Sequence, residues 1–255
     1  MKRKVTVITV AYNSSKTLAD AIESVLRQTY RDIEYWIIDG MSNDNSVEII
    51  KKYESAFEGR LHWISEKDRG IYDAMNKGIR MATGDVIGNL NSDDFFTSDD
   101  VIEKMVEQFT DDIDAIYGDV HFIKEDNEQR CVRYYSGRIF RPYMVKFGFV
   151  PPHPSFYARK KLFDQYGLYD DTYTISADFE MIARLCWKYK VKMKYVHLDF
   201  VCMRVGGAST RSVINRTKGT NEVIKACKKL GIKTCIPMVY MKYPIKILES
   251  LIINR

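Results

Sequence analysis

The chain has 255 residues, of which 45% are hydrophobic and 13% aromatic, and its formal net charge is +5. This composition is sufficient for a sizeable hydrophobic core and favours one α/β domain, with or without a modest extension. Acidic residues are nearly as numerous as basic ones, so the charge suits an anionic ligand or a membrane surface without choosing between them.

The cysteines and the lengths of the apolar runs limit which classes of protein the sequence fits. The five cysteines are odd in number and lack a C-x-x-C spacing, which argues against a zinc site and favours reduced thiols in a cytosolic protein. The apolar run near the N-terminus has seven residues, so we expect a strand there and not a signal peptide. No run of about 18 uncharged apolar residues occurs, and we expect no simple transmembrane helix.

Strand and helix patterns alternate from the N-terminus onward. Strands are expected over residues 5–11, 35–39, 61–65 and 86–90, and amphipathic helices over residues 18–28, 47–53 and 71–81. Further helices are expected over residues 101–109 and from residue 159. Repeats of this length are typical of βαβ units around a parallel sheet.

Polar side chains follow the predicted strands at their carboxyl ends, where parallel sheets bind ligands. Tyr12 follows the first strand, Asp39 ends the second, and Asp93 and Asp94 follow the fourth. Asp39 can accept a hydrogen bond from a nucleobase or a ribose, and the Asp93–Asp94 pair can hold a hard cation such as Mg²⁺. No glycine-rich phosphate loop follows the first strand, so a phosphate ligand would need a metal ion or arginines.

Other polar residues near these strand ends have competing interpretations. Ser98, Asp99 and Asp100 are expected to form the N-cap and the first turn of the following helix. Asn43 and Asp44 precede a helix and either cap it or contact the ligand. Asn76, inside a predicted helix, either makes a local structural hydrogen bond or contacts the ligand.

The motifs VITVAYN, IIDGMSND, SEKDRGIYDAMNKGIRMATGD, LNSDD and SADFEMIARL follow one another between about residues 4 and 210. In this order and spacing the chain resembles the family-2 glycosyltransferases of the A-type nucleotide-diphospho-sugar fold, in particular small bacterial transferases of capsule, O-antigen and exopolysaccharide synthesis. The resemblance implies a single Rossmann-like, mostly parallel sheet flanked by helices. It also implies a catalytic domain over residues 1–210, with a nucleotide-sugar half to about residue 120, an acceptor half beyond it, and a C-terminal helical extension over 211–255.

The resemblance assigns donor-binding roles in the first half. Ala11, Tyr12 and Asp39 are expected to hold the nucleoside, and Arg69, before the third helix, to meet the donor.

The resemblance also places a DxD motif, which binds metal and diphosphate, at Asn91, Ser92 and Asp93. The first position departs from the pattern, because the Asn91 amide brings no charge and can only hydrogen-bond a sugar or ribose hydroxyl. Asp93 is therefore expected as the main ligand of Mg²⁺ or Mn²⁺, with Asp94 as a further ligand or a support.

Inverting sugar transfer needs a base that takes the proton of the acceptor hydroxyl. The resemblance places it at the second residue of the pair Ala177-Asp178. Asp178 shares a helical face with apolar residues, so its carboxylate should point toward the packed side. The alternative is a first-turn aspartate that complements the helix dipole, with Ser176 as N-cap. Glu180 is the second candidate base.

Three segments toward the C-terminus have two interpretations each. His153, between prolines, either lines the acceptor pocket or makes a structural hydrogen bond. Arg211, in the glycine-rich loop 206–212, either closes over the diphosphate or is solvated. The tail from residue 233 either forms an interfacial helix on an anionic membrane, with Ile245, Leu248 and Ile252 on one face, or packs on the catalytic domain or a second subunit.

We therefore expect a cytoplasmic, peripheral inverting glycosyltransferase that moves a sugar from a nucleotide diphosphate, first of all UDP, to a hydroxyl of a lipid-linked oligosaccharide. A nucleotidyltransferase is the closest rival, although it should show a glycine-rich basic loop after the first strand. A non-catalytic polyanion-binding module is a further rival, although it should cluster basic and aromatic residues without the carboxylates. No nucleic-acid partner is expected, and donor sugar, linkage and oligomeric state are left open.

Overall fold

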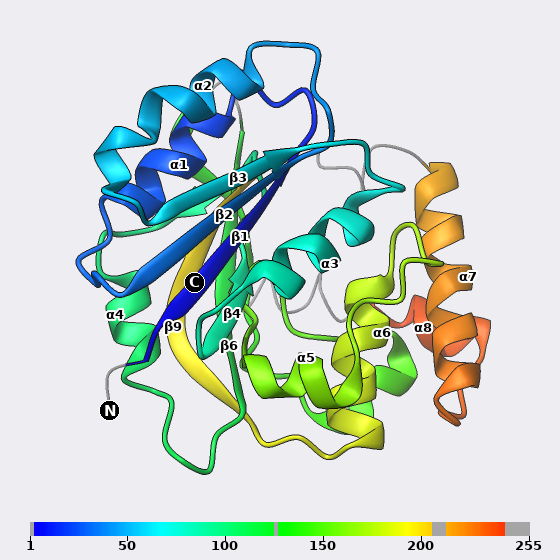
Figure 1. Ribbon diagram of the computed structural model, residues 1–255. Coiled ribbons are helices and arrows are strands. Elements are labelled where there is room, and N and C mark those ends of the chain that lie inside the picture. Colours follow the sequence, from blue (N-terminus) through cyan, green and yellow to red (C-terminus); the bar gives the residue numbers. More distant parts are fainter. Residues whose placement is uncertain (1–2, 125–126, 206–212, 243–255) are drawn as a thin grey trace.

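A computed structural model describes residues 3–124, 127–205 and 213–242 of the chain (Figure 1). Its sheet has the strand order β3-β2-β1-β4-β8-β6-β9-β5, with β7 paired to β6. The strands are β1 (Val5–Ala11), β2 (Ile33–Asp39), β3 (Leu61–Ser65), β4 (Val86–Asn89), β5 (Phe95–Phe96), β6 (Ala115–Lys124), β7 (Asn127–Tyr135), β8 (Tyr157–Arg159) and β9 (Met193–Arg204).

The first four strands pair in parallel, as the alternating pattern predicts. Beyond β4 the sheet is mixed, because β8 is inserted antiparallel between β4 and β6 while β6 and β9 run parallel. The expected halves on either side of residue 120 thus share one sheet. The α/β fold class is confirmed, and the mostly parallel character holds for the N-terminal half.

Helices cover both faces of the sheet (Figure 1). One side carries α1 (Leu18–Leu26), α2 (Ser46–Tyr53) and α4 (Val101–Val106), and the other carries α3 (Ile71–Met81), α5 (Lys160–Tyr166) and α6 (Ala177–Ala183). A π-helical turn, η4 (Arg184–Lys188), continues α6, and the 3₁₀ turns are η1 (Ser55–Phe57), η2 (Pro142–Phe147) and η3 (His153–Ser155). The three helices predicted between the first four strands are confirmed to within two residues at each end.

Close packing fixes the strand that leads to the DxD position. A Cβ atom on Gly88 of β4 would lie 2.1 Å from the ring of Tyr157 on β8, so only glycine fits there. Tyr157 is itself fully buried. The direct approach of β8 to β4 therefore sets where the chain emerges toward Asn91.

The C-terminal extension packs on the catalytic domain through its described part. Helix α7 (Val213–Lys229) packs against α6, and α8 (Ile236–Tyr240) packs against α7 and η2. Arg211 and the predicted apolar face of Ile245, Leu248 and Ile252 lie outside the described residues. Within the part that is described, no helix is long and apolar enough to cross a bilayer, and the five cysteines, all of them described, form no disulfide.

Candidate active site

Asp39 ends β2 beside Ala11 of β1, and the Gly40 amide donates to the Ala11 carbonyl at 2.8 Å. The Asp39 carboxylate is fully buried and accepts hydrogen bonds from the Ser42 amide at 3.0 Å, the Ser42 hydroxyl at 2.5 Å and the Ser65 hydroxyl at 2.6 Å. Both oxygens of the Asp39 carboxylate are thus already engaged by serine residues.

Tyr12, by contrast, is ready to meet a ligand, since 66% of it is exposed. A Cβ atom on Gly40 would lie 3.3 Å from the Tyr12 ring and 3.1 Å from Asp68 Oδ2. Asp68, which sequence reasoning missed, therefore belongs to the same corner. Burial raises the pKa of its carboxyl group, while the ion pair with Lys77 at 2.5 Å opposes the increase. An exposed aromatic ring beside carboxylates suits the recognition of a base and its ribose.

The two carboxylates after β4 have different surroundings. Asp94 is 1% exposed, and its oxygens accept from the Asn91 side-chain amide at 2.7 Å and the Arg204 backbone amide at 3.3 Å. Burial and the neighbouring charge of Asp93 raise the pKa of Asp94 to about 8. Asp93 is only partly buried. Asp94 is thus the enclosed carboxylate of the pair, and Asp93 is the partly exposed one.

Arg204, at the end of β9, holds this turn and was not identified from the sequence. Its guanidinium donates to the Asp93 carbonyl at 3.0 Å and to Asp20 of α1 at 2.6 Å, and it lies over the Phe95 ring. From the other side, the Ser92 and Ser14 hydroxyls are hydrogen-bonded at 2.9 Å. The DxD position is therefore fixed before any ligand arrives.

A divalent cation fits this arrangement. In the described part of the chain no three His, Cys, Asp or Glu side chains gather in a group that could hold a metal ion. Mg²⁺ and similar cations nevertheless often take only one or two protein carboxylates, with diphosphate oxygens and water as the other ligands. Asp93 supplies such a carboxylate, and a bound cation would favour the ionised form of Asp94.

The N-terminus of α3 connects the donor side to the segment before α6. Arg69 forms ion pairs with Asp73 at 2.9 Å and Asp171 at 2.7 Å, and its side chain remains 75% exposed. The hydrogen bond to Asp73 and the charge of Asp171 raise its pKa, so it is a permanent cation. It can turn toward a diphosphate from this position.

Asp178 is the second residue of α6 and is partly exposed. Its Oδ1 accepts from the Phe179 amide at 2.8 Å and lies 3.3 Å from the Tyr72 hydroxyl oxygen. Among the described residues, nothing hydrogen-bonds to Oδ2, so this oxygen is available to take a proton. Ser176 occupies the N-cap position without capping the helix, because its hydroxyl donates to the Gly219 carbonyl at 3.2 Å.

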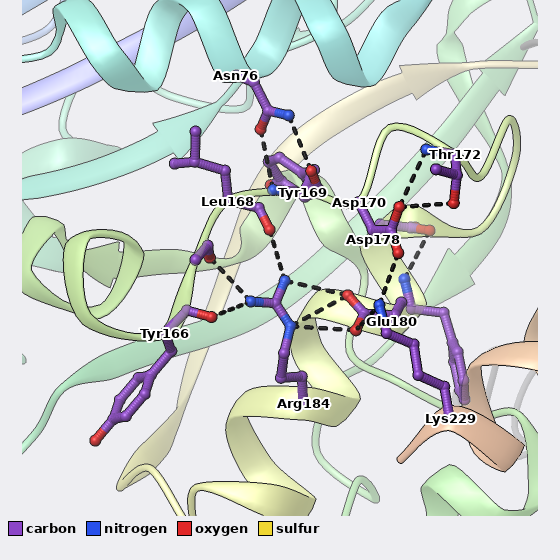
Figure 2. Close-up of polar contacts among 12 residues, drawn as sticks. Asn76, Tyr166, Leu168, Tyr169, Asp170, Thr172, Asp178, Glu180, Arg184 and Lys229 are labelled. Atoms are coloured by element: carbon purple, nitrogen blue, oxygen red, sulfur yellow. Dashed lines mark hydrogen bonds and ion pairs between the residues drawn. The ribbon is translucent and has the colours of Figure 1, made fainter.

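Glu180, the second candidate base, is fully buried and forms an ion pair with Arg184 (Figure 2). Both of its oxygens accept from Arg184 Nε at 3.2 Å, and Lys229 lies 3.9 Å away. Arg184 also donates to the carbonyls of Tyr166, Gly167 and Leu168. Glu180 is therefore the buried counter-ion of Arg184.

His153 and Asn76 meet at Tyr169. His153 Nε2 lies 2.7 Å from the Tyr169 hydroxyl oxygen, which also accepts from the Asn89 side chain at 3.1 Å. Burial lowers the pKa of His153, and the nearby charge of Asp178 partly opposes this. Asn76 pairs with the Tyr169 backbone at 2.9 and 3.0 Å, so the structural interpretation holds for Asn76. His153 lies within the electrostatic range of Asp178.

Asp99 and Asp100 stand apart from this group. Asp99 is paired with Arg27 at 3.4 Å and Asp100 with Lys104 at 2.6 Å, both at the surface. Asp100, and not Ser98, occupies the N-cap position of α4, and its side chain makes no capping bond. Asp44 accepts from the Ser15 and Ser46 amides at 3.0 Å and so ties the first loop to the start of α2.

The chain is similar in sequence to proteins that are named glycosyltransferases. An uncharacterised glycosyltransferase of Mycobacterium tuberculosis is 34% identical over 71% of this chain and 68% of its own length. A Mycobacterium bovis protein named PGL/p-HBAD biosynthesis glycosyltransferase is 25% identical over 91% of this chain and 88% of its own length.

Solved structures share the fold at low identity. The mannosyltransferase PcManGT of Pyrobaculum calidifontis, in complex with GDP-Man and Mn²⁺, has a TM-score of 0.66 at 14% identity, over 95% of this chain and 69% of that one. TarS of S. aureus has a TM-score of 0.64 at 13% identity, and the match covers 90% of this chain but 40% of TarS.

The profile of the family described as Glycosyl transferase family 2 matches residues 6–175, which span Tyr12, Asp39, Arg69 and Asp93. This match covers more than half of the sequence. The chain therefore belongs to glycosyl transferase family 2.

Proposed function

We propose that the protein is an inverting transferase that moves a sugar from a UDP-linked donor to a hydroxyl group of a lipid-linked saccharide. The observation that carries this proposal is the Asp178 carboxylate, which is partly exposed and keeps Oδ2 open. It is connected to the donor side through Tyr72 and, electrostatically, through His153. A base so placed can serve an acceptor hydroxyl that approaches the donor.

The reaction is a single displacement at the anomeric carbon. Asp178 takes the proton of the acceptor hydroxyl, the acceptor oxygen forms a bond to the anomeric carbon, and the bond from that carbon to the diphosphate oxygen breaks. A divalent cation at Asp93, Mg²⁺ or Mn²⁺, would offset charge on the leaving nucleoside diphosphate. Arg69 adds a second positive charge, and Tyr12 and Asp39 hold the nucleoside. A single displacement inverts the configuration of the sugar.

The nucleotide is tested by thermal unfolding with UDP, GDP and other nucleoside diphosphates in the presence of Mn²⁺, because a ligand that binds only the folded state raises Tm. UDP is expected to give the largest increase, and Asp93→Ala should lose the Mn²⁺-dependent part. The neighbouring folds support both options, since TarS has been solved with UDP and PcManGT with GDP-Man. A larger increase in Tm with GDP than with UDP would contradict the proposed UDP-linked donor and favour a GDP-linked one.

The reaction products distinguish the proposed enzyme from two rival functions. A nucleotidyltransferase would bind a nucleoside triphosphate and release pyrophosphate, whereas the proposed enzyme releases a nucleoside diphosphate. A non-catalytic polyanion-binding module would release neither and would show no cation-dependent nucleotide binding.

The proposed lipid-linked acceptor is supported by exposed apolar side chains on η2 of the catalytic domain and around α8 of the C-terminal extension. Tyr143 of η2, Ile236 and Tyr240 of α8, and Met241 are exposed and lie on elements that pack together; we call them the η2–α8 face. The exposed cations Arg141 and Lys233 adjoin these elements in the chain. Exposed apolar side chains beside cations favour an anionic bilayer surface. We infer that the enzyme works as a peripheral protein on the cytoplasmic face of a membrane, in surface polysaccharide synthesis.

A further inference from the structure

Helix α7 of the C-terminal extension is hydrogen-bonded to the segment that leads into α6. The Glu222 carboxylate accepts hydrogen bonds from three consecutive backbone amides, those of Thr174 at 3.0 Å, Ile175 at 2.9 Å and Ser176 at 2.8 Å. The Thr174 hydroxyl adds a fourth bond at 2.8 Å. One side chain thus orders the three residues that end two positions before Asp178.

Two further contacts fix this segment to α7. Lys229 pairs with Asp170 at 2.7 Å, at the start of the segment (Figure 2). At its end, the Ser176 hydroxyl donates to the Gly219 carbonyl, and a Cβ atom on Gly219 would lie 3.2 Å from Ile175 Cγ2. Residues 170–176 are therefore attached to α7 at both ends.

The opposite side of the segment faces the donor-binding half. The Tyr72 hydroxyl of α3 donates to the Ile175 carbonyl at 2.7 Å, and the same oxygen lies 3.3 Å from Asp178 Oδ1. Ile175 is thus held by Glu222 through its amide and by Tyr72 through its carbonyl. The Tyr72 hydroxyl therefore links the backbone of Ile175 to the Asp178 carboxylate.

The Glu222 carboxylate is ionised when it makes these bonds. Its partial burial would raise its pKa, but hydrogen bonds from the Thr174 and Ile175 amides outweigh burial and lower the pKa. Charged acceptors make the stronger hydrogen bonds to backbone amides. A neutral amide at this position would keep one acceptor oxygen and replace the other by a donor that faces amide hydrogens.

We propose that Glu222 is a positioning residue for the transfer step, which holds segment 174–176 so that Asp178 meets the acceptor hydroxyl. The inference rests on the proposed role of Asp178 as the base. It gives the C-terminal extension a part in the chemistry, although the family match ends at residue 175. Misplacement of a reacting group by about 1 Å can cost about a hundredfold in rate.

The test compares Glu222→Gln and Glu222→Ala with Val223→Ala and Asp178→Asn in the full chain. Val223, on the same helix, is 3% exposed and makes no side-chain hydrogen bond, so its truncation lowers Tm through lost packing alone. Release of UDP from UDP-GlcNAc and UDP-glucose with Mn²⁺, with water as the acceptor, gives kcat and KM. Hydrogen exchange over residues 174–179 reports whether the segment is held.

Glu222→Gln should lower kcat by about tenfold to a hundredfold with little change in the donor KM, and Glu222→Ala should lower it further. In both Glu222 variants, the backbone amides of residues 174–179 should exchange hydrogen faster than in a Val223→Ala variant that has lost the same amount of Tm. An equal loss of kcat in Val223→Ala would overturn the inference, because general loosening of α7 would then be the cause.

The outcomes separate this inference from the proposed function. Normal turnover of Glu222→Gln beside a slow Asp178→Asn would overturn the positioning role alone. Normal turnover of Asp178→Asn would overturn the proposed base and this inference with it. Unchanged exchange in Glu222→Gln would overturn the inference even if none of the donors were turned over.

Discussion

Asp93 and Asp94 are adjacent aspartates whose side chains differ in burial. Asp94 is enclosed and hydrogen-bonded on both oxygens, whereas Asp93 is held through its backbone carbonyl, which accepts from Arg204. Arg204 thus anchors the backbone of this turn at Asp93. Replacement of the first DxD carboxylate by Asn91 therefore has a structural use, since the amide donates to Asp94 as a carboxylate could not.

We predict that Asp93→Ala abolishes transfer while the fold is kept, because it removes the carboxylate that a cation can reach. Asp99→Ala is the matched control: Asp99 belongs to the same acidic stretch but pairs with Arg27 at the surface, and its loss should cost about 1 kcal/mol or less. Turnover and thermal unfolding of both variants give the answer. Equal losses of activity in the two would refute the assignment of Asp93.

Asp178→Asn should lower the turnover rate by roughly 10²–10⁴, the usual range for a general base, with little change in nucleotide affinity. Asp39→Asn should have the opposite effect: it should weaken donor binding more than it lowers the turnover rate at saturating donor. Nucleotide titrations and turnover at saturating donor separate the two effects. If Asp178→Asn turned over normally, His153 would be the next base to test, since Glu180 is enclosed by Arg184.

The sequence singles out candidate site residues that directly follow a strand, but it does not single out residues that contact the candidate site from distant segments. Asp39 and Asp93 can be found because a carboxylate directly after an apolar run is visible locally. Arg204 contacts Asp93 from 111 positions away, and Glu222 contacts Thr174 from 48 positions away. Both lie in segments for which the sequence analysis predicts no specific element, and no local signal marks them.

At the scale of elements, the early strands and helices are predictable because each carries its own periodicity. The short strands β5 and β8 are not, since they have two and three residues and exist through pairing with β9, β4 and β6. The end of the fourth helix also differs, because α4 stops at Val106 where a helix to residue 109 was expected.

Glu222 makes the attachment of α7 sensitive to acid. Its pKa is lowered in the folded state, since donated hydrogen bonds outweigh the effect of burial, so the unfolded chain binds the proton first. The stabilisation is fully present above the reference pKa of 4.5 and is lost as the pH falls through the lower folded value. We predict that Glu222→Gln has a flatter decline of unfolding free energy below that pKa than the wild type.

Urea unfolding at neutral pH and on the acidic side of the transition measures this decline. Asn221→Ala is the control, because Asn221 is exposed on the same helix and does not titrate. A wild-type decline that Glu222→Gln reproduces in full would show that other carboxylates carry the acid sensitivity.

At the scale of the molecule, the η2–α8 face should govern membrane binding. We predict that Ile236→Ser with Met241→Ser weakens binding to vesicles that contain anionic lipid but leaves nucleotide binding intact, since the face lies beyond the donor loops. Vesicle co-sedimentation and the nucleotide thermal shift measure the two properties. Val132→Ser, at an exposed apolar residue of β7, is the control. Unchanged sedimentation of the double variant would favour a contact between subunits.

The interleaved order of the sheet has a consequence for synthesis of the chain on the ribosome. Strands β4 and β5 emerge early, but their partners β8 and β9 are made only after residues 156 and 192. Until then the growing chain presents an unpaired strand edge, which invites association with other chains. Arg204, the last residue of β9, closes the turn that holds Asp93. Nascent chains shorter than this should therefore need chaperones and bind no nucleotide, however completely their first four strands have formed.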